Sequence, residues 1–192
     1  MDKNVDRIAL QGDHAGSRSR YRFQTVWWAP AAADQVWAAL ANYAAWPTWW
    51  RGIYNVEVLR SGDESGAGTV LRQWWRSRVP VTLVFDLEMV RIESRRLLDG
   101  RASGDLEGSC RWTLIPVNGG TELRFDVDVR TGRWWMNLPI PFAPRVVRAS
   151  FETIMGWGRE GLAQTLGVPI EPRADDREGY GSLERLAPGV VA

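Results

Sequence analysis

Six strand-like runs in series, followed by one long amphipathic segment, constrain the fold of this chain more than any other feature. Each run alternates apolar and polar residues, and Gly or Asp turn signals separate most of them. A sheet with one apolar face and one charged face is antiparallel and has water on one side only. The apolar face therefore needs a cover. The runs span residues 53–60, 69–76, 81–92, 97–103, 107–116 and 121–131.

The segment from about Ala143 to Leu166 is the only one long enough to provide that cover. Gly158 and Gly161 within it each cost about 1 kcal/mol of helix propensity relative to alanine. We expect these glycines where the helix passes close to the sheet. The apolar residues that recur at helical spacing, and so predict an amphipathic helix, are Val147, Phe151, Ile154, Gly158 and Leu162.

The start of the chain predicts one further strand and two short helices. Residues 21–28 alternate aromatic and polar side chains as in a half-buried strand. Residues 31–40 have helical spacing, and a second helical turn spans residues 43–50. The predicted fold is therefore α+β, with a seven-stranded antiparallel sheet packed on a long C-terminal helix.

The length of 192 residues fits a single domain with tails. Residues 1–19 are rich in Asp, Gly, Ser and Arg and predict a flexible N-terminal arm. Residues 20–168 form the expected folded domain, and residues 169–192 turn polar and predict a flexible C-terminal tail.

The composition excludes several kinds of site. The chain has one cysteine, Cys110, and one histidine, His14, which lies in the polar N-terminal stretch. A disulfide framework, a cysteine-cluster or multi-imidazole metal site, and a Ser-His-Asp triad in the folded core are therefore excluded. The glycines near residue 65 do not precede a helix, so no nucleotide site is predicted. We expect neither a metal nor another cofactor.

The charge and the hydropathy pattern limit the partners and the location. The formal net charge is +1, which gives no reason to expect a nucleic-acid partner. No segment reaches the roughly 18 apolar residues of a membrane span. Residues 1–20 lack the apolar core of a signal peptide. The expected location is the cytoplasm.

Several motifs resemble the polyketide cyclase/dehydrase branch of the START-like (Bet v 1-like, SRPBCC) superfamily, over roughly residues 21–167. The resemblance implies the helix-grip fold, in which a curved antiparallel sheet wraps around the long C-terminal helix and leaves a cavity between them. Members of this group often carry an Asn-His pair where this chain has Ser150-Phe151, so a mechanism using that imidazole is not expected. The motifs are Trp28-Ala29-Pro30, Trp46-Pro47-Thr48-Trp49-Trp50, Ser103-Gly104-Asp105-Leu106-Glu107-Gly108, Gly120-Thr121-Glu122-Leu123, and Met155, Gly158, Gly161 and Leu162.

The two-residue alternation of the strands and the 3.6-residue period of the helix indicate which residues face such a cavity. The alternative for each is that it simply fills the core, but many rigid aromatic rings together suit a planar polycyclic ligand. The residues expected to face the cavity from the strands and the last helix are Phe85, Leu87, Trp112, Phe125, Phe151 and Met155, with Cys110 beside Trp112.

Further candidates come from the entry helices and from the second and third strands. Trp46, Trp49 and Trp50 follow the first helix and either wall one end of the cavity or plug the core. Trp74 and Trp75 are adjacent, so they point to opposite faces of a strand, and we assign Trp75 inward. Gln73 shares the face of Trp75 and would be a polar group at the pocket, while an outward Trp74 would mark a cation–π contact or a homodimer interface. Tyr54 is a further candidate ligand contact.

No catalytic residue is predicted firmly. Asp105 and Glu107 flank a turn at the sheet rim, and a buried carboxyl there would have a raised pKa. Solvated turn residues are the commoner interpretation.

The first functional hypothesis is a binding or carrier protein for a hydrophobic, aromatic or polycyclic small molecule. The second is a polyketide cyclase, aromatase or dehydrase that folds a reactive chain, and the third is a protein-interaction or chaperone-like module.

The segment from Arg133 to Pro144 is too rich in proline for a strand or a helix and carries much apolar surface. We expect it to pack over one mouth of the cavity as a lid, with Trp134 or Trp135 touching the ligand. The alternatives are docking on a partner subunit and contact with a membrane surface, which the lack of a basic cluster disfavours.

Overall fold

The structure is a computed structural model that describes residues 20–131 and 143–173. The chain begins with a strand, β1 (Arg20–Ala29), and continues through three short helical elements. Six strands follow, and then the long helix α3 (Ala143–Leu166) and a short last strand, β8 (Glu171–Arg173). The elements between are α1 (Ala33–Ala41), η1 (Tyr43–Ala45), α2 (Trp46–Trp49), β2 (Ile53–Arg60), β3 (Val70–Arg76), β4 (Thr82–Glu93), β5 (Leu97–Gly104), β6 (Leu106–Val117) and β7 (Gly120–Thr131).

All eight strands form one sheet in the order β2-β3-β4-β5-β6-β7-β1-β8, and every neighbouring pair is antiparallel. The α+β fold and its helix-grip arrangement are confirmed, but the sheet has one strand more than the seven expected. That strand, β8, comes after α3 and pairs with β1 through Val26, Trp27 and Trp28. Three residues that include a proline are too short a run to show the alternation that identifies a strand in a sequence.

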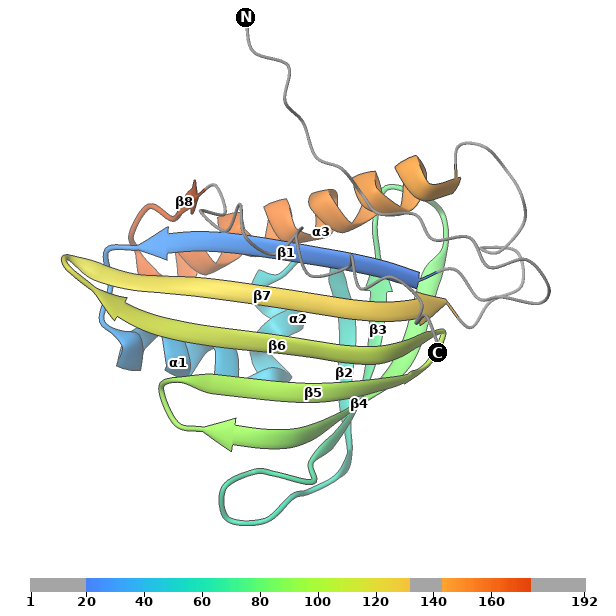
Figure 1. The fold of residues 1–192 in the computed structure, drawn as a ribbon, viewed down its shortest axis with the longest axis horizontal. Coiled ribbons are helices and arrows are strands. Elements are labelled where there is room, and N and C mark those ends of the chain that lie inside the picture. Colours follow the sequence, from blue (N-terminus) through green and yellow to red (C-terminus); the bar gives the residue numbers. More distant parts are fainter. Residues whose placement is uncertain (1–19, 132–142, 174–192) are drawn as a thin grey trace, which may run out of the picture.

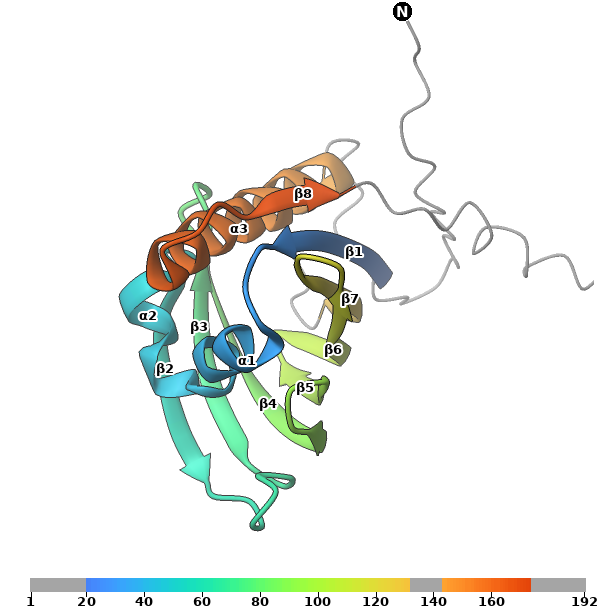
Figure 2. The same cartoon turned by 90° about the vertical axis from the view of Figure 1, so that its left-hand side faces the viewer.

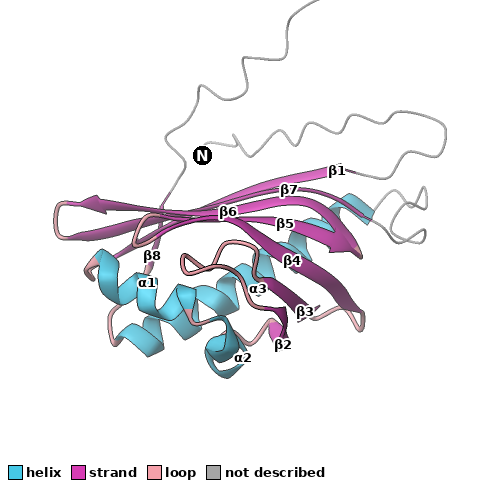
Figure 3. Cartoon of the chain, turned by 90° about the horizontal axis from the view of Figure 1, so that it is seen from below, coloured by secondary structure: helices cyan, strands magenta, loops and turns pink. Residues whose placement is uncertain are grey.

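The sheet curls around α3, so that the helix lies across its open side (Figures 1 and 2). The helices α1, α2 and α3 lie on the same side of the sheet, with α1 and α2 gathered toward one end (Figure 3). The apolar residues of the strands face this side as expected, including Leu87 on β4 and Leu123 and Phe125 on β7. The core therefore lies between the concave face of the sheet and the helices.

Gly158 and Gly161 of α3 lie against the end of α2, not against the sheet as the sequence pattern suggested. A Cβ atom added at Gly161 would lie 1.7 Å from the carbonyl oxygen of Trp49, and one added at Gly158 would lie 2.3 Å from the Trp50 ring. Real Cβ atoms do not approach other heavy atoms this closely, so both positions need glycine. The two glycines let α3 press directly on the residues that end α2.

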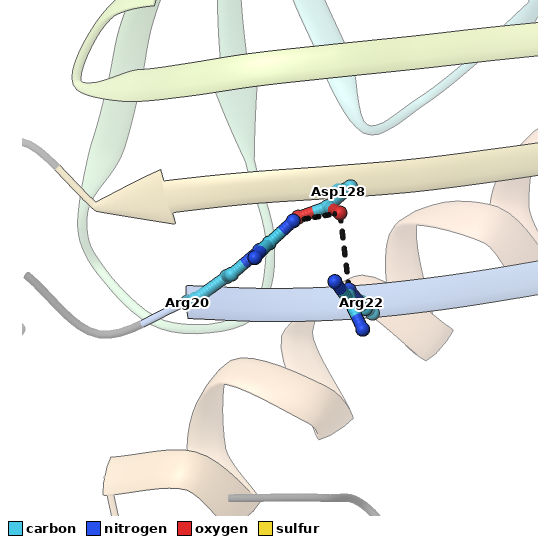
Figure 4. A network of polar contacts seen from close by, with 3 residues as sticks. All are labelled: Arg20, Arg22 and Asp128. Carbon is cyan, nitrogen blue, oxygen red and sulfur yellow. Dashed lines mark hydrogen bonds and ion pairs between the residues drawn. The ribbon is translucent and has the colours of Figure 1, made fainter. Parts of the chain in front are cut away.

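The convex face of the sheet is covered with paired charges. Arg20 donates two hydrogen bonds of 2.6 Å to the carboxylate of Asp128, and Arg22 donates a third of 3.0 Å across the β1–β7 pair (Figure 4). The bond from Arg20, supported by Arg22, lowers the pKa of Asp128. Arg72 and Asp86 form a similar two-point pair between β3 and β4. The charged residues that alternate with the core residues thus lie in water and neutralise one another.

Candidate functional site

A cavity of about 160 Å³ lies between the concave face of the sheet and α3. It is lined almost wholly by apolar and aromatic side chains from β1, β3, β4, β5, β6, β7 and α3, with Trp46 and Trp50 from the α2 region. The side chains of the β3–β4 turn and of the first turns of α3 also line it, and among them Val146 is exposed to solvent. The cavity therefore extends from the interior toward the surface between that turn and the start of α3.

Aromatic rings form a continuous wall around this space. Trp112 and Phe125 stack at 4.4 Å between ring centroids, across the β6–β7 pair. Phe151 on α3 stacks on Phe23 of β1 at 4.2 Å and lies parallel to Phe125 at 6.5 Å. Trp50 joins this group to β3, because its ring lies 6.2 Å from Trp112 and 5.9 Å from Trp75. Flat, mutually supported rings of this kind present rigid faces to a planar ligand.

The indole N–H groups at the α2 end of the cavity are used to hold the helices together. Trp50 donates a hydrogen bond of 2.8 Å to the carbonyl oxygen of Ile154 in α3. Trp46 donates one of 3.1 Å to the carbonyl oxygen of Leu40 at the end of α1. Both rings are buried, so these bonds satisfy donors that water cannot reach. The two tryptophans therefore serve as cavity wall and as structural plug at the same time.

Gln73 places a polar side chain in this wall. It is fully buried on β3, and its neighbours in register are Val56 on β2 and Phe85 on β4. Its Oε1 atom accepts a hydrogen bond of 2.6 Å from the indole Nε1 of Trp75, two residues along the same face. Its Nε2 atom is buried and has no hydrogen-bond partner among the residues that the structure describes.

A second polar point lies where the cavity approaches the surface. Ser77 donates a hydrogen bond of 3.1 Å to Ser150, which ties the end of β3 to α3. Both serines line the cavity. Ser150 and Phe151, adjacent on α3, thus offer the cavity a hydroxyl group and an aromatic ring.

The titratable groups of the described cavity wall are few and are not suited to acid–base chemistry. None of the described lining residues is an Asp, Glu, His, Lys or Arg. Cys110 lines the cavity, and burial, assisted by Asp99, raises the pKa of its thiol to about 12, so it stays protonated at neutral pH. Among the described residues, no three His, Cys, Asp or Glu side chains gather as a metal site would require.

The candidate carboxylates at the sheet rim lie outside the cavity. Asp105 accepts a hydrogen bond of 2.7 Å from the backbone N–H of Val84, which fixes the turn between β5 and β6 to β4. Glu107 is opposite Arg130 in the β6–β7 register. Neither residue lines the cavity, so the solvated-turn interpretation fits them better than an acid–base role.

Most of the residues predicted to face the cavity do line it. Trp75 points inward as assigned, and its neighbour Trp74 does not line the cavity. The predicted residues found in the wall are Trp50, Gln73, Trp75, Phe85, Leu87, Trp112, Phe125 and Phe151, and Cys110 lies there too.

Two predicted contacts are wrong as cavity residues. Tyr54 is 74% exposed, because it is the extra residue of a bulge between Ile53 and Asn55 that turns its side chain away from the interior. Met155 is buried in the core but does not line the cavity. It lies about 100° around α3 from Ile154, which takes the cavity position. Trp134 and Trp135, with the predicted lid segment up to residue 142, fall outside the described residues, and the last two residues of that segment, Ala143 and Pro144, begin α3.

Sequence reasoning missed other wall residues. Tyr21 and Phe23 face the cavity from β1, and Met89 and Val127 face it from β4 and β7. Met89 and Val127 continue the two-residue alternation of strands whose inner face was already identified, and Tyr21 and Phe23 belong to the alternating aromatic residues of the first strand. The alternation was therefore the signal that would have found them. Ser77 and Val79 lie in the β3–β4 turn, where no periodic pattern exists to assign a direction.

The comparisons with known proteins agree with this architecture. The family described as "Polyketide cyclase / dehydrase and lipid transport" matches residues 29–155. No curated protein matches the sequence significantly. No helix in the described part of the chain is both long enough and apolar enough to span a membrane.

Solved structures of similar proteins share the fold at low sequence identity. The Zhui aromatase/cyclase from Streptomyces sp. R1128 superposes with a TM-score of 0.63 at 16% identity, over 76% of this chain and 93% of that one. A START superfamily protein from Mycobacterium smegmatis superposes with a TM-score of 0.60 at 16% identity, over 77% of this chain and 98% of that one. At these identities the likeness establishes the fold alone.

Proposed function

Since this chain belongs to the polyketide cyclase/dehydrase and lipid transport family, we propose that it binds a planar hydrophobic small molecule in the cavity between the sheet and α3. The observation that carries the proposal is the aromatic wall without charged residues among its described members. Small-molecule sites are typically concave, mostly apolar and equipped with a few placed polar groups. Protein interiors hold few voids larger than a water molecule, so a space of about 160 Å³ is unusual for a plain core.

The volume of the cavity favours a compact ligand. An apolar cavity of about 150 Å³ in another protein accepts benzene, so we expect a ligand of one or two rings. A two-ring compound buries roughly 300 Å² of apolar surface, which contributes about 7 kcal/mol. That free energy corresponds to a dissociation constant on the order of 10 µM.

Binding is favoured over acid–base catalysis by the chemistry of the wall. A general acid or base must lie within hydrogen-bond reach of the proton that it moves, and the described wall offers only hydroxyl, amide, indole and protonated thiol groups. The fold shared with an aromatase/cyclase supports a second candidate, a cyclase that acts by holding a reactive chain in one shape. Orientation alone can lower a barrier by several kcal/mol, so such an enzyme would not need a charged wall.

A titration with benzene, indane and naphthalene tests the proposal. Binding next to Trp50, Trp75 and Trp112 should quench the tryptophan emission saturably, with a dissociation constant in the micromolar range. The variant Phe151→Ala removes a ring from the wall and should weaken binding about tenfold. The matched control Tyr54→Ala removes a ring from outside the cavity and should leave binding unchanged.

Two outcomes of the titration would contradict the proposal. The first is the lack of any saturable change with all three compounds. The second is an equal effect of the two substitutions, because the Tyr54 ring is exposed and cannot touch a ligand inside the cavity.

A further inference from the structure

The Gln73 amide is held in one orientation by its neighbour. An indole N–H can only donate a hydrogen bond, so the atom that faces Nε1 of Trp75 at 2.6 Å must be the amide oxygen. The amide cannot rotate by half a turn without placing two donors against each other. The Nε2 group is consequently directed away from Trp75.

This leaves a donor with no acceptor in a buried place. Gln73 is 0% exposed, and its Nε2 has no partner among the described residues. Leaving a buried donor unsatisfied costs free energy, so such groups normally meet a protein acceptor, a water molecule or a ligand. The other buried donor without a partner among the described residues, Nε1 of Trp28, belongs to a residue that does not line the cavity.

From this geometry we infer that the ligand carries a neutral oxygen atom, such as a ketone, quinone or phenol oxygen, which accepts a hydrogen bond from Nε2 of Gln73. The inference rests on the proposed function. It narrows the ligand class, because a pure hydrocarbon would leave the donor unpaired and an ammonium group would oppose it. A carboxylate is disfavoured as well, since no Arg, Lys or His is among the described lining residues to neutralise a buried charge.

A pair of ligands that differ by one oxygen tests this. 1-Indanone and indane have the same ring skeleton, and only the first has a carbonyl acceptor. Their affinities are measured by calorimetry for the wild-type protein and for Gln73→Met. Methionine is unbranched, similar in length to glutamine, and its sulfur can still accept weakly from Trp75. The substitution should weaken the binding of 1-indanone about tenfold and change that of indane by less than about twofold.

The outcomes separate this inference from the function on which it rests. If the wild-type protein binds both compounds and Gln73→Met weakens both equally, or neither, then the amide does not recognise the oxygen and the inference is wrong. If the wild-type protein binds neither compound, the proposed function fails and the inference fails with it.

A measurement without any substitution covers the case in which Gln73→Met does not fold. The isotope-edited infrared spectrum of bound 1-indanone reports the carbonyl stretch. A hydrogen bond from Nε2 should move this band to a lower frequency than it has in hexane. A band at the hexane frequency would show that the carbonyl has no donor in the cavity and would overturn the inference.

Discussion

Cys110 shows how the environment of one residue in this fold decides its chemistry. It lies on β6 in the cavity wall, between Gly100 of β5 and Val127 of β7 in register. Burial is the main reason that its pKa rises to about 12, since a thiolate there would lose its water, and the nearby Asp99 adds to the effect. The native state therefore keeps the proton at a pH where the unfolded chain, with a pKa of 9.0, has begun to release it.

This difference predicts a pH dependence of stability. Between pH 9 and about pH 12 the unfolded chain binds fewer protons at this site than the native protein, so stability falls as the pH rises through that range. By about pH 10.5 the loss of this proton from the unfolded chain should lower the free energy of unfolding by about 1–2 kcal/mol. Denaturant unfolding of the wild-type protein and of Cys110→Ala, at about pH 8 and about pH 10.5, measures it.

The variant isolates the cysteine from other groups that titrate in the same range. Burial also raises the pKa of Tyr43 to about 12, but Tyr43 is present in both proteins. Cys110→Ala should therefore lose less stability than the wild type on going to the higher pH. Equal losses would show that the thiol is not held protonated by the fold.

Single side chains also mark the limit of reading the site from the sequence. Trp75 and Gln73 could be assigned to the inner face because alternation along β3 is regular. Tyr54 could not, because one extra residue in β2 reverses the direction of its side chain and no turn residue announces the bulge. The unpaired donor of Gln73 depends on which way its amide faces, and only the position of Trp75 in space decides that.

At the scale of elements, two glycines of α3 differ in how closely another element packs on them. The atom that a Cβ at Gly161 would meet, 1.7 Å away, is a backbone oxygen of Trp49 and cannot move by rotating a side chain. Gly156, in the same helix, would meet nothing within 4 Å. The two positions therefore form a matched pair within one element.

Alanine at these two positions should have opposite effects. Gly161→Ala should destabilise the protein by about 3 kcal/mol, because α3 and α2 must separate to admit the methyl group. Gly156→Ala should stabilise it by about 0.5–1 kcal/mol, since alanine is the better helix former and has room. For a chain of this size these changes correspond to a melting temperature roughly 6–12 °C lower and about 1–4 °C higher. Calorimetry of the two variants would reject the close-packing account if Gly161→Ala melted like the wild type.

The elements themselves were largely predictable, and the exceptions have physical reasons. The strands from β2 to β7 and the helix α3 follow two-residue and 3.6-residue periodicities that persist for seven residues or more, and their observed bounds agree closely with the pattern. β8 has three exposed residues and exists only because it pairs with β1. The glycines of α3 were expected to lie against the sheet, but they lie against the end of α2. A glycine in a helix predicts that another element packs closely there, but it does not indicate which element.

At the scale of the whole molecule, the cavity depends on segments that are distant in the sequence. Its described wall extends from Tyr21 on β1 to Ile154 on α3. Alternation could identify inner faces one strand at a time, but the volume enclosed by the curved sheet follows from how far it curls around α3, which no local pattern encodes. The presence of a cavity was therefore an implication of the family resemblance, and its size is a result of the structure.

The extent of the stable unit gives the last prediction. The described wall ends at Ile154, but the fold continues to β8, where Ile170 is buried and Arg173 lies over the Trp28 ring at 5.2 Å and 3.8 Å from Glu122. A chain of residues 20–173 should melt within about 2 °C of the full chain and bind indane with the same affinity. A chain ending at residue 168 loses the burial of Ile170 and the pairing of β1 with β8, and should melt about 5 °C lower with little change in affinity. Loss of binding in the 20–173 chain would show that residues beyond this unit complete the site, and equal melting of the two shortened chains would show that β8 adds nothing to the fold.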